Sequence, residues 1–402
     1  MDDKPTLLVT LVGRDRPGVT TAVFSALQGF PVEVLDIEQV VLRGRLVLGL
    51  LITLPRKHEA LRTVMTSVAQ GLGLDAEFEV GTGDSQPRRE GRSHVTVLGA
   101  PLRPGAVAAI AGRVADTGAN IDRIVRMARY PITAIEFHVS GTPPDVLRVA
   151  LAAEAARQQV DVAVQHAGLQ RHGMRLIVID VDSTLVQGEV IEMLAARAGC
   201  QDEVARITEL AMRGDLDFAE ALRRRVALLA GLDAKVLREV YGELELAPGA
   251  RTLVRTLKRL GYRFAIVSGG FSQVTDQLAA DLGIDFAASN TLEIVDGRLT
   301  GRITGPVLDR RGKAEALRRF AGSAGVPISQ TIAIGDGAND LDMLAAAGLG
   351  IAFNAKPVVR EAADTAVNVP YLDAILYLLG ISREEIEAAD AATGVHTPAP
   401  PV

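Results

Sequence analysis

Three short apolar runs in the second half of the chain constrain its fold most, because each ends abruptly in polar residues. The runs are 176–179, 264–267 and 331–334, and they are followed by Asp180, Ser268 and Asp336. Short apolar runs separated by helical patterns are typical of buried parallel strands. In open α/β sheets, ligands bind just outside the carboxyl ends of such strands. The sequence therefore predicts a parallel sheet with a polar crevice at one edge.

An internal repeat occupies the first part of the chain. The tripeptide Arg-Pro-Gly at 16–18 recurs at 103–105, each time between a strand-like run and a helix with apolar periodicity. Residues 34–36 match 120–122 at nearly the same offset. Further strands and a second helix complete the order β-α-β-β-α-β in each copy, which is the ferredoxin-like pattern. We therefore expect two small α+β domains, joined by the polar segment 81–92.

Shifts in composition and pattern divide the chain into four parts. We expect the first repeat at 1–84, the second at 92–168 and the larger domain at 174–387. The remaining segment, 388–402, is rich in Ala, Pro and Thr. Such a composition buries little apolar surface, so we predict that this segment is disordered.

A helical cap is predicted inside the larger domain. Roughly eighty residues separate Thr184 from Ser268, too many for a simple loop between two elements. Helical patterns occur at 190–198, 203–213, 218–229 and 234–241. These helices predict a cap at about 187–250, which would exclude water from the crevice and discriminate between substrates.

Composition excludes several classes of function and location. The 402 residues carry a net charge of -6, which gives no electrostatic reason to bind nucleic acid or an anionic membrane. Cys200 is the only cysteine, so the chain has no internal disulfide, and we expect a buried structural thiol in a reducing compartment. The apolar run 46–54 is too short to span a bilayer, and the N-terminus lacks a signal-peptide pattern. We therefore expect a cytoplasmic protein.

Acidic residues gather at the predicted strand ends. Asp180 and Asp182 are two residues apart after the first strand, and Asp336 and Asp340 follow a later strand. Each alone reads more simply as a helix N-cap, and Lys313 alone reads as a solvated charge. Carboxylates brought together in one crevice repel each other unless a cation lies among them. Their joint occurrence indicates a hard divalent cation held by oxygen ligands.

Four motifs in this order resemble the haloacid dehalogenase superfamily of aspartate-nucleophile phosphatases. The motifs are DVDST at 180–184, SGG at 268–270, Lys313, and GDGAND at 335–340. The resemblance implies a doubly wound parallel α/β sheet with a helical cap, and Mg2+ as cofactor. It also implies that Asp180 is the nucleophile and that Asp182 is the general acid and base.

The same resemblance assigns the remaining residues of the crevice. Mg2+ would bind Asp180, the backbone carbonyl of Asp182, and Asp336. The phosphate would contact Ser268, Gly269, Gly270, Lys313 and Asn339. Asp340 would orient Lys313 or a metal-bound water rather than bind the ion directly.

Within this superfamily, the stretches 180–195, 211–229 and 267–271 look like the phosphoserine phosphatase family. That resemblance implies O-phospho-L-serine as substrate, with Glu189 receiving its ammonium group and Arg225 its carboxylate. Met212 and Phe218 would line the pocket. Without the resemblance, Glu189 reads as a favourable charge at a helix N-terminus, and Arg225 as part of a solvated face formed by the arginines at 223–225.

The repeat resembles the ACT domain, a module that senses small molecules and usually works in pairs. The resemblance implies regulation by L-serine and a homodimer, although both copies could serve dimerisation alone. The candidate effector residues are Asp15, Gly18 and Val19 in the first copy, and Gly105, Asn120 and Ile121 in the second. The first copy has Val34 where the second has Asn120. Since only the amide can bind an amino acid's charged groups, we expect the two copies to differ as sites.

Two other functions remain open from sequence. The chain could be another phosphomonoesterase, or a phosphotransferase that passes the phosphoryl group to an alcohol. It could also be an amino-acid sensor with a silent phosphatase fold. The sensor reading predicts loss of Asp180 or Asp182, and both are present.

Overall fold

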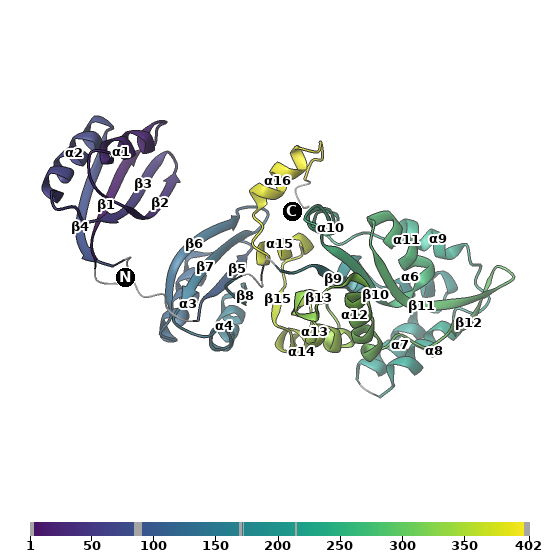
Figure 1. Cartoon of the computed structure of the whole chain (residues 1–402). Coiled ribbons are helices and arrows are strands. Elements are labelled where there is room, and N and C mark those ends of the chain that lie inside the picture. The colour runs from purple at the N-terminus through teal and green to yellow at the C-terminus, as the bar shows by residue number, and fades with distance from the viewer. Residues whose placement is uncertain (1–3, 84–90, 169–170, 172, 214, 398–402) are drawn as a thin grey trace. The chain divides into compact units, whose positions relative to one another are not determined.

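The computed structural model describes residues 4–83, 91–168, 171, 173–213 and 215–397. The chain divides into two compact units, Met1–Arg89 and Glu90–Val402. The first unit holds the first repeat. The second holds the other repeat together with the larger domain (Figure 1). Among the described residues, no helix is long and apolar enough to cross a membrane.

The first unit is a four-stranded antiparallel sheet with two helices on one face. Its elements are β1 (Pro5–Arg14), α1 (Val19–Leu27), β2 (Val34–Leu42), β3 (Arg45–Thr53), α2 (His58–Gly71) and β4 (Leu74–Thr82). The strand order is β2-β3-β1-β4. Alternate residues of β1, such as Leu7, Val9 and Leu11, pack against the helices. This arrangement confirms the predicted ferredoxin-like order.

The second repeat has the same arrangement. Its elements are β5 (Ser93–Gly99), α3 (Pro104–Asp116), β6 (Asn120–Ala128), β7 (Thr133–Ser140), α4 (Pro144–Gln158) and β8 (Asp161–His166). The strand order is β6-β7-β5-β8. Val95 and Val97 pack beneath the helices. On the opposite face, Leu98, Ala134 and Ala163 join the core of the larger domain.

The larger domain is built on a seven-stranded sheet. Its strands are β9 (Leu176–Ile179), β10 (Arg263–Phe271), β11 (Phe286–Val295), β12 (Arg298–Thr304), β13 (Thr331–Gly335), β14 (Leu349–Phe353) and β15 (Thr365–Val367). The order is β12-β11-β10-β9-β13-β14-β15, and β12 alone is antiparallel to its neighbour. The strand order reverses at β9, which pairs with β10 on one side and β13 on the other. Such a reversal is where doubly wound sheets bind ligands.

Helices cover both faces of this sheet, as expected for a doubly wound fold. They are α10 (Ala250–Arg259), α11 (Ser272–Leu282), α12 (Arg310–Ala324), α13 (Leu341–Ala346), α14 (Pro357–Ala362) and α15 (Ile375–Leu378), with short turns η2 (Ile328–Gln330), η3 (Ala338–Asp340) and η4 (Leu372–Ala374). Ile177 and Ile179 share a core with α10, α11 and α15. Leu176 and Val178 share the opposite core with α12, α13 and α14. The central strand is therefore apolar on both faces, which explains its unbroken run.

Four of the five α-helices that the structure describes between β9 and β10 in the sequence form a separate group. They are α6 (Val190–Ala198), α7 (Gln201–Met212), α8 (Phe218–Ala227) and α9 (Val236–Glu243). Each coincides with a predicted helix to within two residues at its ends. Leu194, Val226 and Val240 form a small core with residues of β10, β11, β12 and α11. The helices therefore pack as a cap beside the carboxyl edge of the sheet.

Buried polar contacts join the second repeat to the larger domain. Asp161 accepts hydrogen bonds from the backbone N–H groups of Asn368 (2.6 Å) and Val369 (3.1 Å). Arg171 contacts Glu136 at 2.5 Å and donates to the carbonyl of Leu378 at 2.9 Å. Because both groups of the Arg171–Glu136 pair are buried, each depends on the other for its neutralisation.

We expect Arg171→Met to lower the free energy of unfolding of the second unit by about 3–5 kcal/mol. The substitution leaves the Glu136 carboxylate buried without its cation. The exposed pair Arg126–Glu384 provides a matched control, since Arg126→Met should change stability by less than about 1 kcal/mol. Urea denaturation of the full chain measures both, and equal small effects would contradict the prediction.

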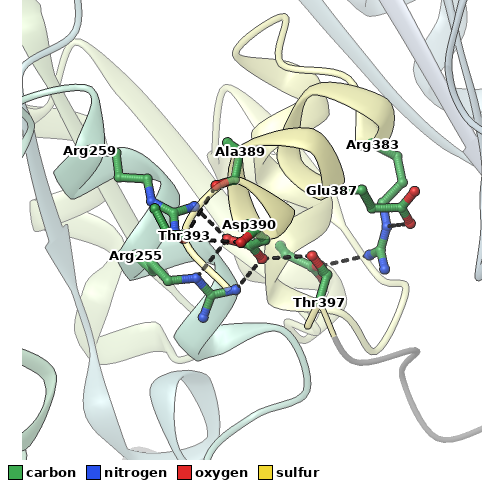
Figure 2. A network of polar contacts seen from close by, with 9 residues as sticks. Arg255, Arg259, Arg383, Glu387, Ala389, Asp390, Thr393 and Thr397 are labelled. Atoms are coloured by element: carbon green, nitrogen blue, oxygen red, sulfur yellow. Dashed lines mark hydrogen bonds and ion pairs between the residues drawn. The ribbon is translucent and has the colours of Figure 1, made fainter. Parts of the chain in front are cut away.

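The prediction of a disordered tail from 388 onward is wrong for residues 388–397. Helix α16 (Arg383–Ala391) begins at a capping box in which Ser382 and Glu385 bond reciprocally. Figure 2 shows Asp390 of this helix between Arg255 and Arg259 of α10. Thr397 also donates to Asp390 at 2.6 Å. This buried carboxylate holds the segment to the domain, and 398–402 lie outside the described residues.

Candidate active site

A single turn places two carboxylates at the end of the central strand. The backbone N–H of Asp180 donates to Ile334 of β13 at 2.9 Å. The chain then forms the π turn η1 (Val181–Leu185), closed by a hydrogen bond from the Val186 N–H to the Val181 carbonyl. Ser183 adopts a positive φ of 58° within it. The turn directs both Asp180 and Asp182 toward the crevice, as their side-chain contacts below establish.

Lys313 joins the ends of two strands by ion pairs. Its Nζ lies 2.8 Å from Asp180 Oδ1 and 2.7 Å from Asp340 Oδ1. The lysine is fully buried on α12, which begins after the N-cap Asp309. Burial lowers the pKa of Lys313, but the carboxylates of Asp180 and Asp340 outweigh it and raise the pKa above its ordinary value. Lys313 is therefore a fixed cation beside Asp180.

Asp182 is held by the cap entrance and by β10. Its Oδ1 accepts from the backbone N–H of Val190 at 2.9 Å, and its Oδ2 accepts from Ser268 Oγ at 3.0 Å. Ser268 Oγ in turn accepts from the Gly270 N–H at 2.7 Å. A Cβ on Gly270 would lie 3.0 Å from Asp182 Oδ2. Any side chain at 270 would therefore crowd this carboxyl group.

A third carboxylate, Asp336, completes an all-oxygen cluster. Carboxylate oxygens of Asp180, Asp336 and Asp340 lie within 4.8 Å of one another. Asp336 Oδ1 accepts from Thr184 Oγ1 at 2.9 Å. Both oxygens of Asp340 are engaged, one by Lys313 and the other by the Gly337 N–H at 3.0 Å. Clustered carboxylates of this kind fit a hard divalent cation.

Burial raises the pKa values of three carboxyl groups of the crevice, those of Asp180, Asp182 and Asp336. The effect is largest for Asp180, where burial and the charge of Asp340 both raise the pKa. Burial is also the leading cause of the raised pKa values of Asp182 and Asp336. A bound divalent cation would stabilise the ionised form of its ligands. The crevice is therefore short of positive charge, which favours cation binding.

Two charged residues of the cap region complete the site. Glu189 Oε1 accepts from Ser183 Oγ at 3.3 Å. Burial, with the negative charges of Asp182 and Asp336, raises the pKa of Glu189 to about 7. Burial lowers the pKa of Arg225, whereas Glu189 and Asp182 raise it. Because the charge of Asp182 affects the pKa values of both Glu189 and Arg225, all three side chains lie in the same part of the site.

Arg225 faces inward although its two neighbours do not. The arginines at 223 and 224 are exposed, whereas Arg225 is half-buried. Its Nη1 donates to Thr208 Oγ1 of α7 at 3.3 Å. Its Nε is buried and has no hydrogen-bond partner among the described residues. This donor is therefore unpaired in the described structure, and the solvated-face reading of Arg225 is wrong.

Of the three other predicted pocket residues, two have side chains that the structure describes. Phe218 is the first residue of α8. The tip of its ring, Cζ, lies 3.3 Å from the position that a Cβ on Gly269 would occupy. Asn339 lies beside Gly337, where a Cβ would meet its Oδ1 at 2.1 Å. Met212 ends α7, but its side chain lies outside the described part of the structure. Phe218 and Asn339 thus lie by the two strand-end loops.

The candidate effector residues belong to both units. In the first unit, Gly18 has a φ of 92° and precedes α1, where Val19 is buried beneath the helix. The Asp15 N–H donates to Gly44 at 2.7 Å. In the second unit, Asn120 Nδ2 donates to Asp122 Oδ1 at 2.7 Å.

The remaining second-unit residues are also placed. Gly105 lies in the first turn of α3, and Ile121 packs against the core beneath the helices. Val34 and Asn120 are the first residues of β2 and β6. The two residues therefore occupy equivalent positions in the two copies.

Three residues that the sequence analysis did not assign also shape the site. Thr184 holds Asp336, and it lies inside the DVDST motif, which was a usable signal. Asn290 is the last residue of β11 that pairs with β10. Its amide donates a hydrogen bond to the Gly269 carbonyl and accepts one from the Leu308 N–H. Thr208 holds Arg225 from another helix, and no local pattern marks it.

Family models and relatives agree with this architecture. A model described as haloacid dehalogenase-like hydrolase matches 174–348, and two ACT domain models match 5–79 and 92–165. The phosphoserine phosphatase of Streptomyces coelicolor is 64% identical over 390 residues, covering 96% of this chain and 95% of that protein. The chain belongs to the phosphoserine phosphatase family. The family's phosphoserine phosphatase SerB2 of Mycobacterium tuberculosis is 56% identical over 398 residues, covering 97% of each chain.

A solved structure supports the fold of this phosphoserine phosphatase family member. The crystal structure of a probable phosphoserine phosphatase from Vibrio cholerae, in unliganded form, is 34% identical. It covers 77% of this chain and 90% of that one, with a TM-score of 0.58. The predicted fold class, a haloacid dehalogenase-like domain preceded by two ACT domains, is confirmed.

Proposed function

We propose that the chain hydrolyses O-phospho-L-serine to L-serine and phosphate through a phosphorylated Asp180. The observation that carries this proposal is the pairing of a carboxylate–lysine crevice with Glu189 and the unsatisfied Arg225 donor. The crevice suits a phosphoryl group, and the two cap-side charges suit the ammonium and carboxylate of an amino acid. Family membership agrees with this assignment.

In the first step, an Asp180 oxygen attacks phosphorus and the bond from phosphorus to the serine oxygen breaks. The departing alkoxide is a strong base, so it takes a proton from Asp182. Burial raises the pKa of Asp182 and favours the protonated form that this step needs. In the second step, Asp182 takes a proton from a water molecule as the water oxygen attacks phosphorus. The bond from phosphorus to the Asp180 oxygen breaks, which releases phosphate and restores the Asp180 carboxylate.

Positive charge and fixed donors stabilise the transferring group. Lys313 lies 2.8 Å from the attacking carboxylate and offsets its charge. Ser268, with the backbone of Gly269 and Gly270, would donate to the phosphate oxygens, and Asn339 would help to hold them. Asp340 contacts Lys313 at 2.7 Å, so we assign it to positioning that lysine.

The acidic cluster suits Mg2+ as the cofactor. Asp180, Asp336 and the backbone carbonyl of Asp182 would hold the ion, since they supply only hard oxygen donors. When bound, Mg2+ would neutralise the phosphate and favour its in-line position. Asp340 already has both oxygens engaged, so it is the weaker candidate ligand within the cluster.

Substrate choice would rest on the cap-side residues. Glu189 would receive the ammonium group, and Arg225 would bind the carboxylate through its guanidinium group. Thr208 fixes the Arg225 guanidinium at 3.3 Å, so it positions this contact. Phe218 and Met212 would line the intervening apolar wall.

A substrate comparison tests the proposal directly. O-phosphoethanolamine lacks the carboxylate, and phospholactate lacks the ammonium group. We expect kcat/KM for O-phospho-L-serine to exceed both by at least about 100-fold, because buried charged groups would be left unpaired. Equal turnover of all three would favour a general phosphomonoesterase. Transfer of phosphate to an added alcohol would favour a phosphotransferase.

The pKa of Glu189 predicts a pH dependence. With a pKa of about 7, Glu189 is neutral at pH 6 and anionic at pH 8. We therefore expect kcat/KM for O-phospho-L-serine to rise through pH 7, because only the anion pairs with ammonium. Glu189→Gln should lose about 10–100-fold at pH 8 and less at pH 6.

The two pH profiles must be compared with each other, because the substrate phosphate also titrates near pH 6. That titration affects the unaltered chain and Glu189→Gln equally. The ratio of their kcat/KM values therefore reports on Glu189 alone. A ratio that stays constant from pH 6 to 8 would contradict the role.

We further propose that the ACT domains sense L-serine and that the enzyme acts as a cytoplasmic homodimer. Asn120 offers a polar amide at the start of β6, where the first copy has Val34. Assays with and without L-serine, for the unaltered chain and Asn120→Val, test the sensing role. Sedimentation tests the dimer.

A further inference from the structure

Two histidines and a glutamate gather on the sheet of the second ACT domain, away from the catalytic crevice. His94 lies on β5, and Glu136 and His138 lie on β7. His94 is paired directly with His138 across the two strands. Their rings are edge to face, with centroids 4.6 Å apart. The two imidazoles therefore lie next to each other on the same face of the sheet.

The donor atoms converge on one carboxylate oxygen. His94 Nδ1 and His138 Nε2 each lie 3.2 Å from Glu136 Oε1. One donor from each of the three residues lies within 4.8 Å of the others. In a tetrahedral zinc site with bonds of about 2.0–2.1 Å, ligand atoms are about 3.3 Å apart. The 3.2 Å spacings from Glu136 to the two histidines therefore match those of a metal site.

Hydrogen bonding does not account for all of these contacts. His94 Nδ1 is buried but has no hydrogen-bond partner of acceptable geometry among the described residues, despite its 3.2 Å distance from Glu136. A buried polar atom without a partner is unfavourable. A metal ion between the two atoms would satisfy it.

The other oxygen of the glutamate is already fixed. Glu136 Oε2 contacts Arg171 at 2.5 Å and Thr96 Oγ1 at 3.4 Å. Carboxylates that bind metals usually have such an outer partner, which holds the ligating oxygen in place. His138 keeps 31% of its side chain exposed, so water can reach the cluster.

The first ACT domain shows that the sheet does not need these residues. Leu8 pairs with Leu51 where His94 pairs with His138, and Thr10 pairs with Gly49 where Thr96 pairs with Glu136. The repeat therefore forms the same sheet with apolar residues at both histidine positions. The cluster is a feature of the second copy alone.

We propose that His94, Glu136 and His138 bind Zn2+ or a similar divalent transition ion, with water completing the shell. Imidazole nitrogen with one carboxylate favours such ions over Mg2+. Because the positive Arg171 shares the same carboxylate, we expect weaker binding than at a cysteine-rich structural zinc site. The site is independent of the catalytic cluster, which offers only oxygen ligands.

Co2+ is a suitable probe, because its visible spectrum distinguishes imidazole-containing sites of low coordination from pale octahedral oxygen sites. Untagged, chelator-treated full-length protein, saturated with Mg2+, is titrated with Co2+. We expect one equivalent to produce an intense visible band that Zn2+ abolishes. Absence of the band would overturn the proposal.

Matched variants locate the ion. His94→Leu/His138→Leu introduces the residues of the first copy, and we expect at least about 100-fold weaker Co2+ binding. Asp336→Asn alters the catalytic cluster and should leave the band intact. Retention of the band in the double variant, or its loss in Asp336→Asn, would overturn the assignment.

Two further measurements keep the test independent of folding. The single variant His138→Leu changes the more exposed histidine and should also lose the band, with its fold checked by circular dichroism. X-ray absorption of the zinc-loaded, unaltered protein should show two imidazoles in the first shell. A shell of oxygen atoms alone would contradict the site.

Discussion

Asp180→Asn is expected to release phosphate from O-phospho-L-serine at least about 10⁴-fold more slowly than the unaltered chain. The amide cannot form the acyl phosphate, while Lys313 and the rest of the crevice remain in place. Acid-quenched rapid mixing with labelled substrate should trap phosphate on Asp180 in the unaltered chain and on no residue of the variant. Activity within tenfold of the original, or a label on another residue, would refute the mechanism.

Stability separates this loss from misfolding. Burial and the charge of Asp340 raise the pKa of Asp180, which means that its anion is unfavourable in the folded cluster. A neutral amide relieves that repulsion, and Lys313 keeps its contact with Asp340 at 2.7 Å. We therefore expect the Tm of Asp180→Asn, measured without metal, to equal or exceed that of the unaltered chain.

Asp182→Asn should show a loss that depends on the leaving group. For O-phospho-L-serine we expect a decrease of about 10²–10⁴-fold, because the alkoxide departs without a proton. For 4-nitrophenyl phosphate, whose leaving group is stable as an anion, the first step should fall by less than about tenfold. The variant should then give a rapid burst of nitrophenol and accumulate phosphorylated enzyme, since water lacks its base.

The control for this experiment is Asn339→Ala, which removes a proposed phosphate contact but leaves Asp182 with its hydrogen bonds to Val190 and Ser268. Its losses should be similar for both substrates, because Asn339 would contact phosphate rather than the leaving group. An equal loss for both substrates in Asp182→Asn, without a burst, would exclude Asp182 as the general acid.

The catalytic crevice was predictable because its signals are local. Asp180, Ser268 and Asp336 each follow an apolar run, and the carboxyl ends of parallel strands meet at one edge. The cap helices were equally visible from their periodicity. Thr208 was not, because its role depends on how α7 packs against α8. The Arg171–Glu136 pair likewise depends on a domain contact that no spacing reveals.

The error at the C-terminus has a specific physical cause. The alanines of this segment bury little apolar surface, yet alanine is the most favourable residue in a helix. Ser382 and Glu385 have the spacing of a capping box, a helix-start signal that composition alone does not contain. What fixes the helix is the buried Asp390 with Arg255 and Arg259, which only the folded domain brings together.

Helix α16 lies against two domains at once. It contacts the phosphatase domain through Asp390 and the second ACT domain through Glu384 and Arg126. The two contacts differ in strength, because Asp390 is buried between two arginines whereas Glu384 and Arg126 are exposed. Without α16, the contacts of Asp161 and Arg171 would still hold the same two domains together, but Arg255 and Arg259 would lose their shared carboxylate.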